Sequence, residues 1–127
     1  MHRGRAKRAG MCGVDYVNLH GTGTQANDKM EAKAVNLTLG ATFASTIKPQ
    51  IGHTLGAAGA IESAICAMLC MDENSLLPPH VYDGEYDESL EAINLVKSGT
   101  KFDVKTAMSL SFAFGGDNAA IIFKRVR

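Results

Sequence analysis

Short runs of β-branched, aromatic and aliphatic residues alternate along the chain with glycine-containing loops. Runs of this kind, bounded by turn residues, predict strands. They cover residues 14–19, 43–47, 94–96, 107–112 and 119–124. Gly115 and Gly116 lie between the last two runs, which therefore predict an antiparallel hairpin. The polar, acidic stretch at 81–89 predicts a surface loop.

Two segments between these runs have a helical pattern. Asn27 and Asp28 are expected to cap the first helix, and Gly40 is expected to end it. The second helix is expected from about Leu55 to Met71; it is apolar on nearly every face, which predicts burial, and Glu62 is its only charge. Its small-residue start, with Gly56 and Gly59, predicts close packing, because glycine in a helix costs about 1 kcal/mol relative to alanine. Residues 3–10 are expected to form the last turns of a further helix.

Composition narrows the class of protein. The 127 residues suffice for one small domain or part of a larger one, and 46% of them are hydrophobic. The net charge of zero provides no field that would recruit nucleic acid or a membrane surface. No apolar run reaches about 18 residues, and no secretory signal precedes residue 13. The odd count of three cysteines (Cys12, Cys66 and Cys70) predicts reduced thiols and a cytoplasmic location.

Polar residues capable of chemistry gather in the loops that follow the first two predicted strands. His20 and His53 lie in separate loops of this kind, so we expect them to meet at one pocket, where an imidazole N–H stabilises an oxyanion. Glu31 is expected to pair with Lys48, and the hydroxyls of Thr22 and Thr24 are expected to face a ligand. Each residue alone also fits a structural role, and it is their combination that favours a functional site. The Cys and His spacing fits no zinc pattern.

Four motifs in this order resemble the C-terminal part of the β-ketoacyl-acyl-carrier-protein synthases of elongating type. They read His20-Gly-Thr-Gly-Thr, Asn27-Asp-Lys-x-Glu, Lys48-x-x-x-Gly-His-x-x-Gly-Ala-Ala-Gly and Ser111-Phe-x-Phe-Gly-Gly-x-Asn. The resemblance implies the α/β, C-terminal half of a thiolase-like fold, with a mixed sheet and a buried central helix. On this interpretation residues 1–127 are one domain, incomplete at its N-terminus and missing its first strand.

The resemblance also assigns roles to individual residues. It implies that His20 and His53 donate to the malonyl thioester oxygen, stabilising the enolate that decarboxylation forms. Lys48 would support this pair and Glu31 would engage the lysine. The residues implied to bind substrate are Thr22 and Thr24, which would hydrogen-bond the phosphopantetheine arm, and Phe112 and Phe114, the latter supplying an oxyanion-hole N–H and a ring that gates the acyl pocket.

The function implied is a decarboxylating Claisen condensation in fatty-acid or polyketide synthesis, with substrates carried on phosphopantetheine and no further cofactor. Its implied partners are acyl carrier protein and an N-terminal half that bears the cysteine nucleophile. Cys66 and Cys70 lie inside the apolar helix, and Cys12 matches no motif, so the chain alone is expected to be inactive as an acyltransferase.

Two alternatives to a synthase fragment stay open. One is a non-catalytic subunit of a split or degenerate synthase, which would act as a binding or assembly module. The other is an unrelated nucleotide- or metal-binding module. Ala113 and Asp117 depart from the usual residues of the glycine turn, and Leu110 stands where a polar residue is common. Because an apolar helix without its partner half would be exposed, we also expect self-association, with a homodimer as one form.

Overall fold

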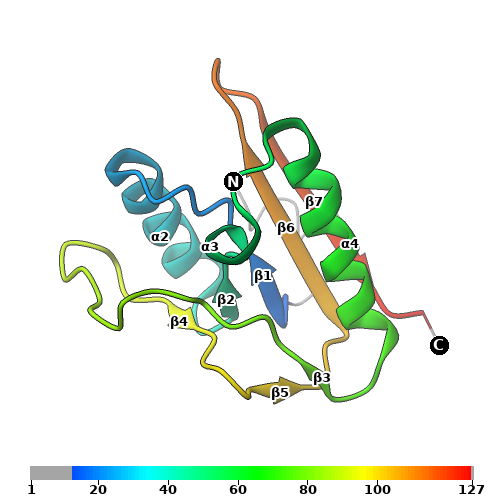
Figure 1. Ribbon diagram of the computed structural model, residues 1–127. Coiled ribbons are helices and arrows are strands. Elements are labelled where there is room, and N and C mark those ends of the chain that lie inside the picture. Colours follow the sequence, from blue (N-terminus) through cyan, green and yellow to red (C-terminus); the bar gives the residue numbers. More distant parts are fainter. Residues whose placement is uncertain (1–12, 127) are drawn as a thin grey trace.

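The computed structural model describes residues 13–126, in which a five-stranded mixed sheet is flanked by two long helices (Figure 1). The expected helix at residues 3–10 and any strand preceding it lie outside the described residues. The elements in chain order are β1 (Tyr16–Asn18), α2 (Gln25–Leu39), β2 (Phe43–Ser45), α3 (Lys48–Ile51), the 3₁₀ turn η1 (Leu55–Ala57), α4 (Ala58–Met71), β3 (Ser75–Leu76), β4 (Asn94–Leu95), β5 (Lys101–Phe102), β6 (Thr106–Phe112) and β7 (Asn118–Lys124).

The sheet has the strand order β4-β2-β1-β6-β7, which places β1 at its centre. Strands β4, β2, β1 and β6 run parallel to one another, and β7 runs antiparallel to β6. Asn18, the last residue of β1, lies beside Ser45 of β2 and Ser109 of β6. The loops that leave β1 and β2 therefore start at the same edge of the sheet, where open α/β sheets bind ligands.

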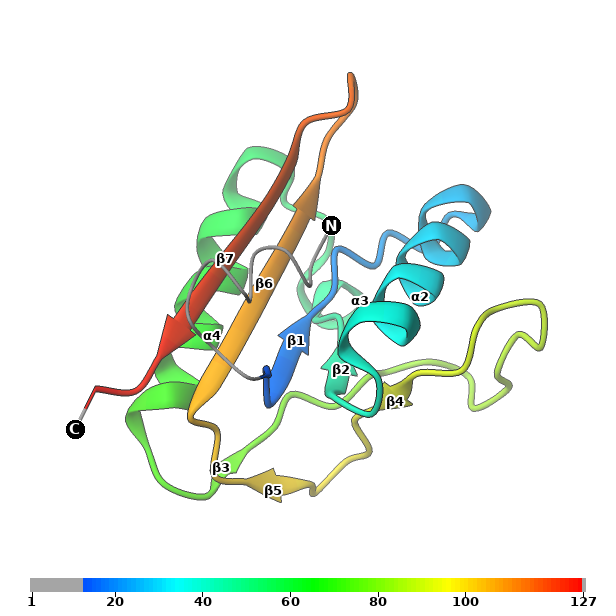
Figure 2. The ribbon, with the colours of Figure 1, turned by 180° about the vertical axis from the view of Figure 1, so that it is seen from behind.

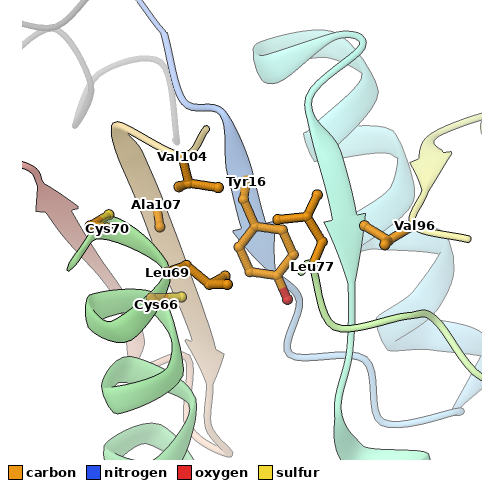
Figure 3. Close-up of a cluster of buried hydrophobic side chains, with 8 residues drawn as sticks. All are labelled: Tyr16, Cys66, Leu69, Cys70, Leu77, Val96, Val104 and Ala107. Carbon is orange, nitrogen blue, oxygen red and sulfur yellow. The ribbon is translucent and has the colours of Figure 1, made fainter. Parts of the chain in front are cut away.

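Each face of the sheet packs against one helix, as the two opposite views show (Figures 1 and 2). Successive residues of a strand point to opposite faces. Tyr16 accordingly packs with Cys66 and Leu69 of α4 in one buried cluster (Figure 3), whereas Val17 packs with Val35 of α2 in a second one. The Tyr16 hydroxyl is hydrogen-bonded to Ser45 Oγ at 2.8 Å, so its polar end is satisfied inside the apolar layer.

The structure confirms the strands at 43–47, 94–96, 107–112 and 119–124 within one or two residues at each end, and β6 and β7 form the expected hairpin. The strand at 14–19 is confirmed as the shorter β1. Close packing at the start of α4 is confirmed at Gly59, where an added Cβ would lie 3.3 Å from Ser111 Oγ, but not at Gly56, which has open space around it.

The expected start of the first helix was wrong, and three short elements (α3, β3 and β5) were not predicted. α2 begins at Gln25 rather than after Asn27 and Asp28, because Asp28 N–H already donates to the Thr24 carbonyl and closes the first turn. The loop after β2 contains the short helix α3, whose Pro49 lies in the first turn, a position that favours helix initiation. The two-residue strands β3 and β5 pair antiparallel and had no sequence signal long enough to predict them.

α4 is buried on one side only, contrary to the expectation of burial on every face. Its buried side carries Glu62, Cys66, Leu69 and Cys70. On the opposite side Met68 and Met71 are 63% and 77% exposed, and Ile61 is 37% exposed. These three residues, spaced seven and three apart along the helix, form an apolar stripe. A stripe of this kind on a helix this apolar predicts an interaction surface. Within residues 13–126, no helix combines the length and the apolar character needed to cross a membrane.

We predict that Met68→Lys lowers the self-association of this chain, because it places a charge at the centre of the apolar stripe. The mass measured by light scattering after size-exclusion chromatography should fall toward that of a monomer. The free energy of unfolding should change by no more than about 0.5 kcal/mol, since the side chain is exposed. Leu37→Lys is the matched control: Leu37 is 64% exposed on α2, on the other face of the sheet, and its substitution should leave the mass unchanged. A dilute wild-type chain that is already monomeric would contradict the prediction.

Candidate active site

The two histidines predicted from the sequence meet at the edge of the sheet where β1 and β2 end. His20 follows β1 and His53 follows α3. Their ring centroids are 5.7 Å apart and their planes are nearly perpendicular, at 88°. Phe112, the last residue of β6, packs its ring edge-to-face against His20 with centroids 5.6 Å apart. The structure thus brings together three residues that lie far apart in the sequence.

Glu31 holds the backbone of the His20 loop. Its side chain, from α2, is buried, and its two carboxylate oxygens each accept one backbone hydrogen bond. Oε1 accepts the N–H of His20 at 2.7 Å, and Oε2 accepts the N–H of Gly21 at 2.8 Å. Burial raises the pKa of Glu31, whereas these two N–H donors act to lower it. A carboxylate with both oxygens engaged in this way fixes the direction in which the loop leaves β1.

Thr46 sets how closely the His20 loop approaches the end of β2. Gly21 has a φ of +45°, and a Cβ built on it would lie 2.6 Å from the Thr46 Cβ. No side chain other than hydrogen therefore fits between the two segments. Thr46 Oγ1 also accepts the N–H of Lys48 at 3.3 Å, which starts α3. Thr46 consequently contacts both of the segments that carry the histidines.

Lys48 forms a buried ion pair with Glu62 Oε1, which joins α3 to α4. Only 7% of Lys48 and 1% of Glu62 is exposed, so the pair is shielded from water. Burial raises the pKa of Glu62, and the hydrogen bond and charge of Lys48 act against that rise. Separating the partners would leave an uncompensated buried charge, which typically costs about 3–5 kcal/mol. The pair therefore fixes the segment that leads from β2 to His53.

Electrostatics keep the His20 imidazole neutral, and a hydrogen bond sets the orientation of the His53 ring. Burial, together with the positive charge of Lys48 and the neighbouring His53, lowers the pKa of His20 to about 4. His53 accepts the N–H of Leu55 at Nδ1 over 3.3 Å, so its neutral ring carries the proton on Nε2. A neutral imidazole can donate its N–H to a developing oxyanion without first being protonated.

Of the remaining predicted site residues, three lie near His20 and one lies away from it. Thr22 and Thr24 lie in the loop after His20, with their hydroxyl oxygens 3.1 Å apart. Phe112 lies against His20, as described above, but Phe114 lies at the tip of the β6–β7 hairpin with its side chain fully exposed. The hairpin turn is closed by the Ala113 N–H, which donates to the Asp117 carbonyl at 2.9 Å. The roles of these four residues toward a substrate stay predictions.

Neither described cysteine is suited to act as a nucleophile. Cys66 and Cys70 are buried between α4 and the sheet. Burial raises the pKa of the Cys66 thiol to about 12 and also raises that of Cys70. A thiol with a raised pKa and no access to solvent forms little of the reactive thiolate. Cys12 lies outside the described residues. Among residues 13–126 no group of three or more His, Cys, Asp or Glu side chains could hold a metal ion.

The expected pair between Glu31 and Lys48 was wrong. Lys48 points to α4 and pairs with Glu62, whereas Glu31, on α2, bonds to the backbone of the His20 loop. The two glutamates belong to helices on opposite faces of the sheet, which the sequence spacing does not reveal. One signal was present: Glu62 is the single charge of an otherwise apolar helix, and a buried charge needs a partner. The contact between Thr46 and Gly21 had no such signal.

Comparison with known proteins decides the family. Residues 5–82 match the family described as beta-ketoacyl synthase, C-terminal domain, which is more than half of the chain. The chain belongs to this family. The 3-oxoacyl-[acyl-carrier-protein] synthase 1 of Haemophilus influenzae is 41% identical to it over 115 residues, which are 88% of this chain and 28% of the relative. The β-ketoacyl synthase domain therefore spans less than a third of the length of that relative.

Solved structures agree with this assignment. A β-ketoacyl synthase from Burkholderia phymatum superposes with a TM-score of 0.88 at 32% identity, covering 96% of this chain and 30% of that one. A ketosynthase in complex with its chain length factor, from Xenorhabdus doucetiae, superposes with a TM-score of 0.87 at 38% identity, covering 95% of this chain and 31% of that one. The predicted fold, the C-terminal half of a thiolase-like architecture with a mixed sheet, is confirmed.

We predict that Gly21→Ala destabilises the β-ketoacyl synthase domain by about 2–4 kcal/mol, because it adds both a collision with Thr46 and a side chain at positive φ. Gly23→Ala is the matched control: Gly23 also has a positive φ, of +74°, but open space around its Cβ position, so its substitution should cost only about 1 kcal/mol. Urea unfolding monitored by circular dichroism measures both values. Equal losses in the two variants would show that Thr46 does not restrict the loop.

We predict that the imidazole of His20 titrates with a midpoint of about 4, far below the ordinary value of 6.5. Its folded-state pKa is lowered, so the unfolded chain binds more protons between these two values. Stability should therefore fall as the pH decreases from 6.5 toward 4. NMR of the ring Cε1–H resonance measures the midpoint, and His20→Asn identifies the resonance. A midpoint near 6.5 would mean that Lys48 and burial do not act on this ring.

Proposed function

We propose that this chain supplies the decarboxylation half of a β-ketoacyl synthase active site. In this reaction a malonyl thioester carried on phosphopantetheine loses CO₂, and the enolate that forms attacks an acyl group held elsewhere in the enzyme. The observation that carries the proposal is the edge-to-face pair of His20 and His53 at the carboxyl ends of β1 and β2. Two imidazoles this close together suit donation to a single developing oxyanion.

The chemistry follows from the state of each ring. His53 presents its Nε2–H because Nδ1 is engaged by Leu55, and His20, with a pKa of about 4, is uncharged at neutral pH. Both rings can therefore donate to the thioester oxygen as negative charge develops on it during the loss of CO₂. The ion pair of Lys48 with Glu62 fixes the segment that leads to His53, and the hydrogen bonds of Glu31 fix the His20 loop. Little reorganisation is therefore needed in the transition state.

The acyl group needs a nucleophile, and the described cysteines do not suit that role. We propose that the cysteine nucleophile belongs to the part of a whole synthase that this chain does not align with, about seven-tenths of the Haemophilus influenzae relative. Acyl carrier protein is the proposed donor of substrate, in line with the name of that relative. Thr22 and Thr24 are the proposed contacts of the phosphopantetheine arm, and Phe112 and Phe114 the proposed contacts of the acyl chain.

The apolar stripe on α4 supports the proposal of a partner half. Met68 and Met71 are exposed on a helix whose other side is fully packed against the sheet. A second candidate function, a non-catalytic assembly module of a split synthase, uses the same stripe without needing the histidines. It is favoured by the high pKa of the buried thiols. The two candidates differ in whether His20 and His53 matter for turnover.

The experiment is a chimera. The aligned C-terminal segment of the Haemophilus influenzae 3-oxoacyl-[acyl-carrier-protein] synthase 1 is replaced by this chain, and release of ¹⁴CO₂ from malonyl-acyl carrier protein is measured. We predict decarboxylation by the chimera and a loss of at least about 100-fold in both His20→Ala and His53→Ala, since each removes one oxyanion donor. Leu37→Ala, on the exposed face of α2, is the control and should retain full activity. A folded chimera that does not release CO₂ would favour the assembly module instead.

A further inference from the structure

A third described histidine, His80, is hydrogen-bonded to Thr46 beside the site and has no role in the chemistry above. It follows Pro78 and Pro79 in the segment that joins β3 to β4. Its backbone N–H donates to the Val96 carbonyl at 2.9 Å, and the Val96 N–H donates to the Ala44 carbonyl of β2 at 3.0 Å. The half-buried imidazole is thereby fixed beside the end of β2, and its Nδ1 accepts the N–H of Thr46 at 3.3 Å.

Thr46 is the residue through which this hydrogen bond reaches the active site. It is buried, and its side chain packs against Gly21 of the His20 loop while its Oγ1 accepts the N–H of Lys48. Its own N–H is the single donor that its backbone offers at this junction, and His80 is the group that accepts it. A shift of Thr46 would move both segments at once, because a Cβ-sized gap does not exist between Thr46 and Gly21.

We propose that His80 is a positioning residue of the condensing site: its neutral imidazole holds Thr46, and through Thr46 the spacing of the His20 loop and Lys48, and protonation of His80 releases that hold. The proposal rests on the proposed function only in naming what is positioned. The imidazole can accept the Thr46 N–H at Nδ1 only while that nitrogen is unprotonated. When Nδ1 is protonated, its N–H and the Thr46 N–H are both donors and face each other. The Thr46 N–H then has no acceptor in His80.

The surroundings of His80 allow this proton exchange. The ring lines a cavity of about 250 Å³ between α2, the end of β2 and the 80–95 segment, which also reaches Gly21 and Thr46. No lysine or arginine lines this cavity. The titratable groups that do line it are Asp28 and Glu31 from α2, and Tyr82, Glu85, Tyr86 and Asp87 from the segment of His80 itself. The centroid of the Tyr82 ring lies 5.4 Å from that of His80.

Burial lowers the pKa of His80, and the charge of Asp28 acts to raise it. The sign of the pH dependence follows from this. At neutral pH the imidazole is uncharged and accepts the Thr46 N–H, and the hold weakens only as the pH falls below the ordinary value of 6.5. Glu31 contacts the same cavity, but both of its oxygens are engaged by the His20 loop, so its hydrogen bonds do not compete for His80.

Two substitutions separate the hydrogen bond from the titration. His80→Asn places an amide oxygen near the position of Nδ1, so it can accept the Thr46 N–H but does not titrate. His80→Gln has the same chemistry on a side chain one methylene longer, which carries its oxygen near the position of Nε2 and away from Thr46. Neither substitution touches a residue of the catalytic or substrate-binding set.

The test is NMR of the whole ¹⁵N-labelled chain between pH 4.5 and 8. We expect the amide resonances of Thr46, Lys48 and Gly21 to shift with one midpoint, equal to that of the His80 ring, in the wild-type chain. In His80→Asn this pH dependence should be lost while the positions at pH 8 are kept. In His80→Gln the Thr46 amide should move at every pH and exchange faster with solvent. Amides that titrate unchanged in His80→Asn, or a Thr46 resonance in His80→Gln identical to wild type, would overturn the proposal.

If a variant does not fold, the wild-type titration alone tests the proposal. A Thr46 amide resonance that does not shift at the midpoint of the His80 ring would contradict it. In the chimera, His80→Asn should keep the decarboxylation rate at pH 8 within about twofold of wild type. It should also abolish the part of the fall in rate at acidic pH that is due to His80. His80→Gln should lower the rate about tenfold at every pH. The NMR readout does not depend on catalysis. A chimera without activity but with the expected amide shifts would thus contradict the proposed function and leave the positioning role supported.

Discussion

The buried ion pair between Lys48 and Glu62 is the interaction on which the geometry of the site depends. It links the segment after β2 to α4, and α4 in turn packs on the central strands β1 and β6 through Cys66, Leu69 and Cys70. With Lys48 fixed, the four residues of α3 and the turn after them place His53 opposite His20. The polar layer between sheet and helix is thus an integral part of the fold, and its cost in desolvation is offset only while both partners remain.

Glu62 and Glu31 fix different segments of the site because they lie on opposite faces of the sheet. Glu62 acts on the side of the sheet that faces α4, through a charged partner, whereas Glu31 acts on the side of α2, through backbone N–H groups. Each histidine is therefore fixed by a carboxylate from a different helix. Thr46 lies between the two arrangements and contacts Gly21 on one side and Lys48 on the other. This contact ties the two halves of the site into one unit.

Much of the architecture could be predicted from the sequence because its signals are local. Short apolar runs bounded by turn residues predicted the strands, and a glycine turn predicted the β6–β7 hairpin. The meeting of His20 and His53 was predicted from their place in two loops that follow strands. What failed depends on tertiary placement. The choice of Glu62 over Glu31 as the partner of Lys48 requires knowing which face of the sheet each helix covers. His80 belongs to no motif, and its contact with Thr46 joins residues 34 apart in the sequence.

The pairing of charges in this site has a consequence for how it would accommodate a carboxylate. Lys48 is compensated by Glu62, His20 is uncharged at neutral pH, and His53 accepts an N–H that a protonated ring could not accept. The described residues around the two rings therefore leave no uncompensated positive charge, and they offer a carboxylate little electrostatic attraction. A malonyl group entering it would lose hydration without gaining a counter-ion. If the proposed function holds, loss of neutral CO₂ would relieve that unfavourable state. The site would then favour decarboxylation in two ways: it provides no counter-ion for the malonyl carboxylate, and it donates N–H groups to the enolate that forms.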